Sequence, residues 1–181
     1  MQPSGAGVIV LQGEAAELRT IQARDTAALT ALLAEPDIQR QALLRRGGTL
    51  SPAAVRELAQ RMLQPEAEGG LHLGIYAPGG TELIGVASLQ RWSRAERLAR
   101  LGYLVHPAKR GRGIATEAVR LLLRYAFAEL GLAAVEGRCR GDNPASERVM
   151  RNNGMTLKHI IAEAGPSGDV IKVFASVTQL K

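Results

Sequence analysis

The sequence is poor in cysteine and aromatic residues, and it contains no long apolar run. The single cysteine, Cys139, cannot form an internal disulfide, which fits a reducing cytoplasm. Aromatic residues make up only 3% of the chain, which disfavours a protein that stacks nucleic-acid bases. No window approaches the roughly 18 apolar residues of a membrane span, and the first residues lack the basic start and apolar stretch of a signal peptide. These absences predict a cytoplasmic protein without a membrane partner.

Length and charge limit the remaining possibilities. The chain has 181 residues, of which 46% are apolar and 22% charged, as expected for one globular domain. We expect this domain to span residues 16–181, behind a flexible N-terminal lead-in of residues 1–15. The net charge of +6 suits either nucleic acid or a polyanionic cofactor. The chain has no long basic block and no Cys/His cluster with metal-ligand spacing, so we expect neither nucleic acid nor a metal.

Hydrophobic periodicity predicts an α+β domain, a mixed α/β arrangement with the order β-α-α-β-β-β-α-β-α-β-β. Strands are expected near 17–21, 72–76, 82–90, 100–106, 133–139, 156–164 and 170–177, and helices near 25–35, 51–64, 114–130 and 143–154. The central strand, long helix and following strand form one right-handed crossover. We therefore expect a mixed sheet with helices on both faces.

The segment RGRGIAT, Arg110–Thr116, lies between an expected strand and an expected helix. The first amides of a helix have no intrahelical partner, and the helix dipole places partial positive charge there. Gly111 and Gly113 let a ligand approach the backbone, while the two arginines add charge and Thr116 a hydroxyl. The segment therefore predicts a phosphate or pyrophosphate site. The plainer alternative is a tight turn with solvated arginines.

RGRGIA also matches the Gln/Arg-x-x-Gly-x-Gly/Ala signature, and the chain resembles the GNAT superfamily of acyl-CoA-dependent N-acyltransferases. The segments LGYLVHPAKRGRGIATEAVRLLLRYAFAELGL, DNPASERVMRNNGM and ELIGVASL are similar to the group that acetylates N-termini of ribosomal proteins. The resemblance covers roughly residues 17–178. It implies a GNAT-like fold, with a central, mostly antiparallel sheet splayed between two strands, and acetyl-CoA as the acyl donor.

The resemblance also implies where the coenzyme binds. The pyrophosphate is expected on the backbone amides from Arg110 to Ala115, and the pantetheine arm along Leu104 and Val105. A backbone amide at Leu104 would polarise the thioester carbonyl, and such a donor is worth roughly 3–4 kcal/mol. The coenzyme-binding residues expected are Leu104, Val105, Arg110, Gly111, Arg112, Gly113, Ile114, Ala115, Thr116, Asn143 and Ser146.

Asn143 and Ser146 each have two interpretations. By position alone, Asn143 caps a helix and Ser146 in its first turn needs no further role. The resemblance implies that Asn143 binds the pantetheine and that Ser146 lies near the sulfur. Ser146 is therefore the candidate general acid that protonates the leaving thiolate.

Arg100 departs from the family pattern. The stretch RLGY begins at Arg100 where the family often has Glu-x-Gly-Tyr, so the general base is unknown. A positive charge there lowers the pKa of a nearby ammonium group and can pair with an anionic group on the acceptor. The alternative is that Arg100 extends into solvent. The hypothesis is that Arg100 contacts an anionic part of the acceptor.

Other residues give weaker candidates for the base, and each has a plain interpretation as a surface or hydrogen-bonded group. They are His72, Glu82, Glu136, His159 and Glu163. His106 is expected at a strand end, and Cys139 in the core because it lacks an evident His partner. The acceptor side is expected from residues 25–65 and the final hairpin, with a mobile loop at Leu43–Leu50 and with Trp92 either lining the pocket or packing.

Two functions stay open on the sequence alone. The first is an N-acetyltransferase in which a protein N-terminus or a small-molecule amine attacks acetyl-CoA directly, through a ternary complex. The second is a catalytically degenerate regulator that binds coenzyme A, which the residue at 100 favours. A third interpretation, an RNA-associated protein, is supported only by the pI of about 10.1. The sequence also allows a homodimer.

Overall fold

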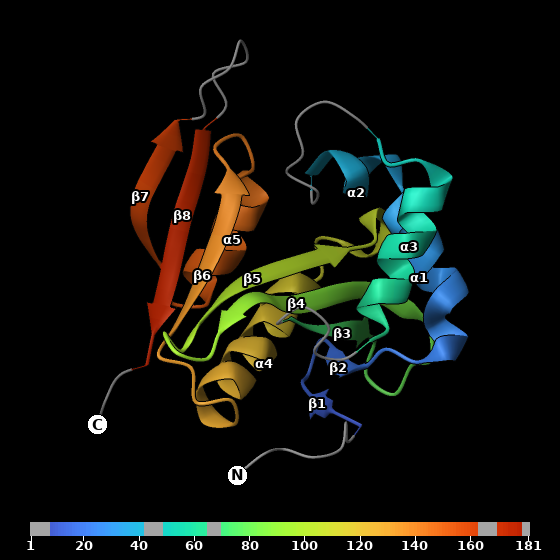
Figure 1. Ribbon diagram of the computed structural model, residues 1–181, viewed down its shortest axis with the longest axis horizontal. Helices are drawn as coiled ribbons and strands as arrows, with labels where there is room; N and C mark the ends of the chain where they lie inside the picture. Colours follow the sequence, from blue (N-terminus) through green and yellow to red (C-terminus); the bar gives the residue numbers. More distant parts are fainter. Residues whose placement is uncertain (1–7, 42–48, 65–69, 163–169, 179–181) are drawn as a thin grey trace.

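The computed structural model describes residues 8–41, 49–64, 70–162 and 170–178, which form an eight-stranded sheet flanked by helices (Figure 1). The strand order is β1-β2-β3-β4-β5-β6-β8-β7. The strands are β1 (Val10–Gln12), β2 (Glu17–Thr20), β3 (Leu71–Tyr76), β4 (Leu83–Ser93), β5 (Leu98–Val105), β6 (Ala134–Arg140), β7 (Thr156–Ala162) and β8 (Val170–Val177). Only β5 and β6 are parallel neighbours among these strands, which confirms the expected mixed, mostly antiparallel sheet.

The parallel pair is short and then separates. Its pairing runs from Leu98 opposite Ala134 to Leu101 opposite Gly137. Beyond that row β5 and β6 continue without pairing to each other, and they diverge (Figure 1). The expected splay between two strands is therefore confirmed, and it leaves one edge of β5 open.

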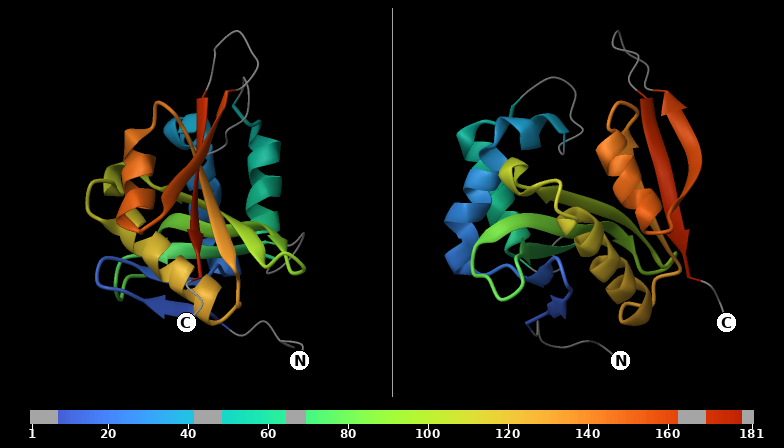
Figure 2. Two further views of the ribbon diagram at one scale, coloured as in Figure 1. Left: turned by 90° about the vertical axis from the view of Figure 1, so that its left-hand side faces the viewer. Right: turned by 180° about the vertical axis from the view of Figure 1, so that it is seen from behind.

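The helices pack on the two faces of the sheet through two separate apolar clusters. On one face lie α4 (Ile114–Ala128) and α5 (Pro144–Asn152), and on the other α1 (Thr26–Ala34), α2 (Pro36–Gln41) and α3 (Pro52–Met62). The left view of Figure 2 shows gold α4 and orange α5 on one side of the strands and teal α3 on the other. None of the helices in the described ranges is long and apolar enough to cross a membrane.

Two elements were not expected from the sequence. Pro36 begins α2 instead of ending the helical region, because proline is tolerated in the first turn of a helix. Residues Val10–Gln12, within the expected lead-in, form β1 and pair with β2. Residues 1–7 lie outside the described part of the chain, so the division into lead-in and domain stays a prediction.

The first helix begins at Thr26 with Asp25 in the N-cap position, as expected, but the Asp25 side chain makes no cap hydrogen bond. Asp25 belongs to a short 3-10 helix, Ala23–Asp25. Its buried carboxylate accepts hydrogen bonds from the Tyr76 hydroxyl and from the Gln22 N–H, both at 2.9 Å. Asp25 therefore joins the helical layer to β3, a role that spacing in the sequence does not reveal.

Candidate functional site

The N-terminus of α4 is open to a ligand. Its N-cap is Gly113, which has no side chain to accept from the first-turn amides. Two other α-helices do have a side-chain cap. Ser51 Oγ accepts from the Ala54 N–H of α3 at 3.2 Å, and Asn143 Oδ1 accepts from the Ser146 N–H of α5 at 3.0 Å. The longest helix of the described chain thus presents uncapped amides and the positive end of its dipole.

The two glycines of the loop before α4 are required by backbone conformation. Gly111 and Gly113 have φ of 75° and 76°, in the left-handed region that favours glycine. A Cβ built on either residue would meet no heavy atom within 4 Å. The space above the loop is therefore open, and an anion could approach these amides closely.

Arg110 does not direct its charge into this space. Its Nε donates to the carbonyl of Val105 at 3.0 Å, and its guanidinium forms an ion pair with Asp37 on α2. The hydrogen bond that the Arg110 guanidinium donates to Asp37 holds the pKa of this carboxyl below its usual range. Arg110 therefore shapes the loop and ties it to α2. Arg112, which is exposed and pairs with none of the described carboxylates, carries the charge of the loop.

The open edge of β5 exposes alternate backbone groups. The N–H of His106 donates to the carbonyl of Ile84 on β4 at 2.9 Å. Backbone hydrogen bonding alternates along an antiparallel strand. The backbone N–H and C=O of Leu104 therefore also point toward β4, whereas those of Tyr103 and Val105 point toward the opening. The amide that can polarise a thioester between the strands is therefore that of Tyr103 or Val105, and not that of Leu104 as the sequence suggested.

A pair of hydroxyl groups lies beside this edge. The Tyr103 hydroxyl and Ser146 Oγ are 2.7 Å apart, and either can be the donor. Burial raises the pKa of Tyr103 to about 12, so its phenol is protonated at neutral pH. Ser146 was expected near the sulfur, whereas Tyr103 was missed. Its position could have revealed it: Tyr103 comes two residues after Leu101 on β5, so both side chains lie on the face of the sheet that packs against α4.

Arg100 lies on the opposite face of β5, in a cluster of charges. It stands directly across from Glu136 on β6, with Nε 3.7 Å from the carboxylate. Arg138 approaches the same carboxylate oxygen at 3.8 Å. Burial, followed by repulsion from Arg138 and Arg91, lowers the pKa of the Arg100 guanidinium. Arg100 therefore faces Glu136 and Arg138, while one third of its side chain stays exposed.

The sequence of this chain also matches a known protein family. Residues 16–156 match the family model described as the acetyltransferase (GNAT) domain. The chain belongs to the GNAT acetyltransferase family.

Two curated relatives align with this GNAT chain over part of their length. A probable N-acetyltransferase of Bacillus subtilis strain 168, YjcK, is 40% identical over 96 residues, which is 52% of either chain. The ribosomal-protein-serine acetyltransferase of Escherichia coli K12 is 34% identical over 84 residues, which is 46% of either chain. Each alignment therefore spans about half the length of the curated relative.

Solved GNAT structures share the fold at lower identity. RimL, a ribosomal L7/L12 α-N-protein acetyltransferase in complex with coenzyme A, is 22% identical, with a TM-score of 0.78 over 93% of this chain and 98% of that chain. Spermidine N-acetyltransferase from Vibrio cholerae, in complex with coenzyme A and spermine, is 17% identical, with a TM-score of 0.77 over 91% and 96%. At these identities the likeness establishes the fold.

Of the other candidate bases in this GNAT domain, His72 is the most enclosed. Its Nδ1 lies 2.8 Å from Ser88 Oγ, and burial lowers its pKa. Glu82 pairs with Lys109 at 3.2 Å, and His159 is exposed on β7. Glu163 lies outside the described residues. His72 is thus neutral at pH 7 and hydrogen-bonded within the sheet.

Three further expectations can be compared with the structure. Cys139 is buried, and burial raises the pKa of its thiol, so it behaves as a core residue rather than a nucleophile. Trp92 packs against the apolar cluster under α4. His106 caps the 3-10 helix Pro107–Lys109, and its Nδ1 accepts from the N–H of Ala108 at 3.2 Å. Within the described part of the chain, no group of His, Cys, Asp and Glu could hold a metal ion.

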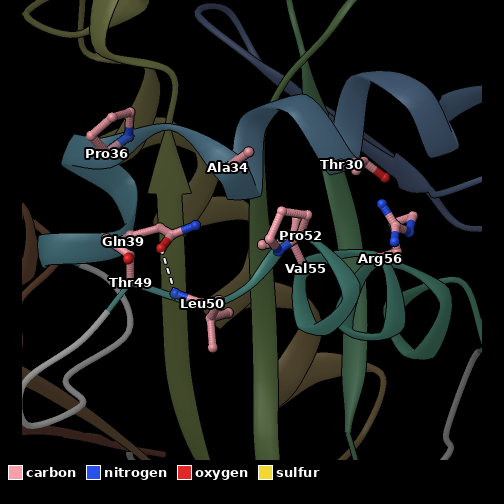
Figure 3. Close-up of a pocket in the computed structure, with 9 residues that line it drawn as sticks. All are labelled: Thr30, Ala34, Pro36, Gln39, Thr49, Leu50, Pro52, Val55 and Arg56. Carbon is pink, nitrogen blue, oxygen red and sulfur yellow. Dashed lines mark hydrogen bonds between the residues drawn. The ribbon is translucent and has the colours of Figure 1, made fainter.

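A cavity of about 260 Å³ lies among α1, α2 and α3, in the region expected for the acceptor (Figure 3). Buried Gln39 bridges its wall, because its side chain donates to the carbonyl of Leu33 at 3.1 Å and accepts from the N–H of Leu50 at 2.7 Å. The cavity is lined by Thr30, Ala34, Pro36, Gln39, Thr49, Leu50, Pro52, Val55 and Arg56. Residues 42–48, most of the expected mobile loop, lie outside the described residues.

Proposed function

We propose that the protein is an acetyl-CoA-dependent N-acetyltransferase that transfers an acetyl group to a primary amine by direct attack in a ternary complex. The observation that carries this proposal is the uncapped N-terminus of α4, which follows an open glycine loop directly beyond the free edge of β5. A phosphate group suits the first feature and an extended pantetheine arm the second. Membership of the GNAT family supports the combination.

The coenzyme would be held mainly by backbone groups. The amides from Gly111 to Thr116 would bind the pyrophosphate, and Arg112 would add positive charge. The Arg110 amide is not included because it already donates to the Pro107 carbonyl at 3.3 Å. Asn143 uses its Oδ1 to cap α5, which leaves its Nδ2 hydrogens for the pantetheine. The N–H of Val105 faces the opening and would polarise the thioester carbonyl.

The chemistry then needs one bond to form and one to break. The amine nitrogen attacks the carbonyl carbon, and the tetrahedral intermediate collapses with cleavage of the C–S bond. The hydroxyl of Ser146 gives its proton to the thiolate and regains one through Tyr103, whose phenol is protonated. The amine releases one proton to solvent and the hydroxyl pair takes one up, so the protons balance.

The acceptor would be a protein N-terminus or a small-molecule amine. Proteins named for both kinds of acceptor are similar to this chain: a curated relative is named a ribosomal-protein-serine acetyltransferase, and a solved structure of the same fold is a spermidine N-acetyltransferase. A degenerate regulator that binds coenzyme A is the second candidate, and the arginine at position 100 is the observation that favours it. A cytoplasmic location fits both candidates because Cys139 is a free thiol.

Thermal unfolding and thiol release together test the proposal. The protein is mixed with acetyl-CoA and a panel of amines and N-terminal peptides, and free thiol is followed over time. Stabilisation with amine-dependent thiol release supports the enzyme. Stabilisation with no release for any amine supports the regulator, and no stabilisation by acetyl-CoA contradicts both.

A further inference from the structure

Two guanidinium groups approach one carboxylate at the base of the opening between β5 and β6. Arg100 and Arg138 both face Glu136, and repulsion from Arg91 contributes to the lowered pKa of Arg100. Among the described residues, two positive charges therefore meet this carboxylate. A cluster of this kind repels itself unless an anion joins it.

The existing contacts leave donors unused. The distances of 3.7 Å and 3.8 Å to Glu136 exceed the 2.7–2.9 Å of charge-assisted hydrogen bonds. Within the described residues, Nε of Arg138 is shielded from solvent and has no hydrogen-bond partner. A buried donor without an acceptor is costly. The side chains of Arg100 and Arg138 are nevertheless 33% and 31% exposed, so a ligand can reach them.

The cluster lies beside the opening that would hold the thioester, on one face of the sheet. Arg100 and Glu136 form the row before the last paired row, and Arg138 follows that last row on the diverging part of β6. Side chains alternate along β5, so Arg100 shares its face with Leu104, which packs under α1 and α3. Tyr103 and its partner Ser146 occupy the opposite face. An amine that approaches opposite the leaving sulfur would therefore pass the cluster.

We propose that the acceptor is an amine that also carries a carboxylate or phosphate group, and that Arg100 and Arg138 bind this anionic group. The inference rests on the proposed acetyltransferase function. Paired guanidinium groups suit planar or tetrahedral oxyanions because they can donate several parallel hydrogen bonds.

The same charges explain how the site works with arginine in the position of the usual carboxylate. A positive field lowers the pKa of a nearby ammonium group, which raises the share of neutral amine that can attack. The anionic group of the acceptor supplies the attraction that a bare ammonium group would lack. Polycationic amines such as spermidine gain no such attraction and are repelled.

Matched acceptors that differ by one charge test the proposal. Acetyl transfer is measured for the peptide amides Ser-Asp-Ala and Ser-Asn-Ala, for β-alanine and β-alaninamide, and for spermidine. We expect kcat/KM to favour the carboxylate member of at least one pair by about tenfold or more. Preference within the peptide pair would indicate an acidic N-terminus, and preference within the other pair a small amino acid.

Variants assign the preference to the cluster. Arg100→Gln and Arg138→Gln should each bring the ratio close to one, while the Kd for coenzyme A stays unchanged. Arg61→Gln, on the exposed end of α3, removes the same charge elsewhere and should keep the ratio. Arg100→Glu should lower the ratio below one; full activity with unchanged preference in that variant would overturn the proposal.

A binding measurement keeps the inference separate from the proposed function. Succinate is titrated into the protein saturated with coenzyme A, with wild type and Arg100→Gln compared by calorimetry. Binding that is lost in the variant supports the anion site even if no acceptor of the panel is acetylated. Absence of succinate binding in wild type refutes the anion site, as do equal and measurable rates within both acceptor pairs, and neither result contradicts acetyl transfer itself.

Discussion

Gly113 shows at the scale of one residue how the backbone forms the proposed coenzyme site. Its φ of 76° costs a residue with a side chain roughly 1–2 kcal/mol, and open space above it admits a ligand. Gly79, in the turn between β3 and β4, has φ of 68° and equally open surroundings. The two glycines therefore differ in place but not in backbone constraint, which makes Gly79 a matched control.

Gly113→Asp should abolish coenzyme A binding, because it adds bulk and negative charge where the pyrophosphate would lie. Gly79→Asp should lower the stability to a similar extent and keep the coenzyme affinity. Calorimetric titration and thermal unfolding of both variants give the two quantities. Equal affinity of Gly113→Asp and wild type for coenzyme A would refute the assignment of the loop.

The hydroxyl pair predicts a change in turnover rather than in binding. Ser146→Ala should lower kcat by less than about 10²-fold, since the thiol leaving group is acidic and needs only modest help. Tyr103→Phe, which removes the 2.7 Å contact, should lower kcat less and leave the KM for acetyl-CoA near that of wild type. Steady-state kinetics for both variants test this. A Ser146→Ala enzyme with the kcat of wild type would exclude Ser146 as the acid.

His72 predicts how stability depends on pH. Burial lowers its pKa below the ordinary value of 6.5, so the folded protein binds fewer protons than the unfolded chain between the two values. Its contribution to stability is therefore complete above about pH 6.5 and is lost as the pH falls through the lowered pKa. Wild type should lose more Tm between pH 7.5 and pH 5 than His72→Asn, and parallel losses in both proteins would contradict this.

At the scale of the element, the N-cap residue of α5 would have two roles, whereas the N-cap residue of α3 has one. Asn143 caps α5 and would also bind the coenzyme, whereas Ser51 only caps α3. Both side chains accept from an amide of the first turn. Comparing the two caps therefore separates helix stability from coenzyme recognition.

Asn143→Ala and Ser51→Ala should each lower the free energy of unfolding by about 1 kcal/mol. Only Asn143→Ala should also weaken binding of coenzyme A. Denaturant unfolding and calorimetric titration measure the two effects. Unchanged coenzyme affinity in Asn143→Ala would leave Asn143 with the capping role alone.

The elements also show what the sequence could and could not reveal. The long helix, its glycine loop and the splayed pair were predictable because glycines, periodicity and the family signature are local patterns. The face of Tyr103 and the direction of the Leu104 amide depend on strand register, which no local pattern specifies. Likewise Pro36 could end one helix or begin another, and only packing of Ile38 into the core decides for α2.

At the scale of the whole molecule, the opening divides the sheet into two parts joined by one short parallel pairing. A coenzyme bound along β5 would contact α4, α5 and the loop between β5 and α4, and would thereby link both parts. A ligand present at 100 times its Kd adds about 2.7 kcal/mol to stability. Stability of the protein should therefore depend strongly on coenzyme concentration.

Hydrogen exchange can locate that stabilisation. Saturating coenzyme A should slow exchange of the amides of Tyr103 and Val105 and of the segment 111–116, while the edge strands β1 and β7 change little. The same experiment with Gly113→Asp is the control without binding. Protection confined to the cavity among α1, α2 and α3 would contradict the placement of the coenzyme.

The open edge of β5 and the uncapped start of α4 also bear on how such proteins diverge in evolution. In the proposed function both would recognise the coenzyme through main-chain groups, which most substitutions leave in place. The opposite face is made of side chains such as those of Arg100, Glu136 and Arg138, which single mutations can exchange. One donor can thus be retained through long sequence drift while acceptor preference changes, so identity to a relative is a better guide to the donor than to the acceptor.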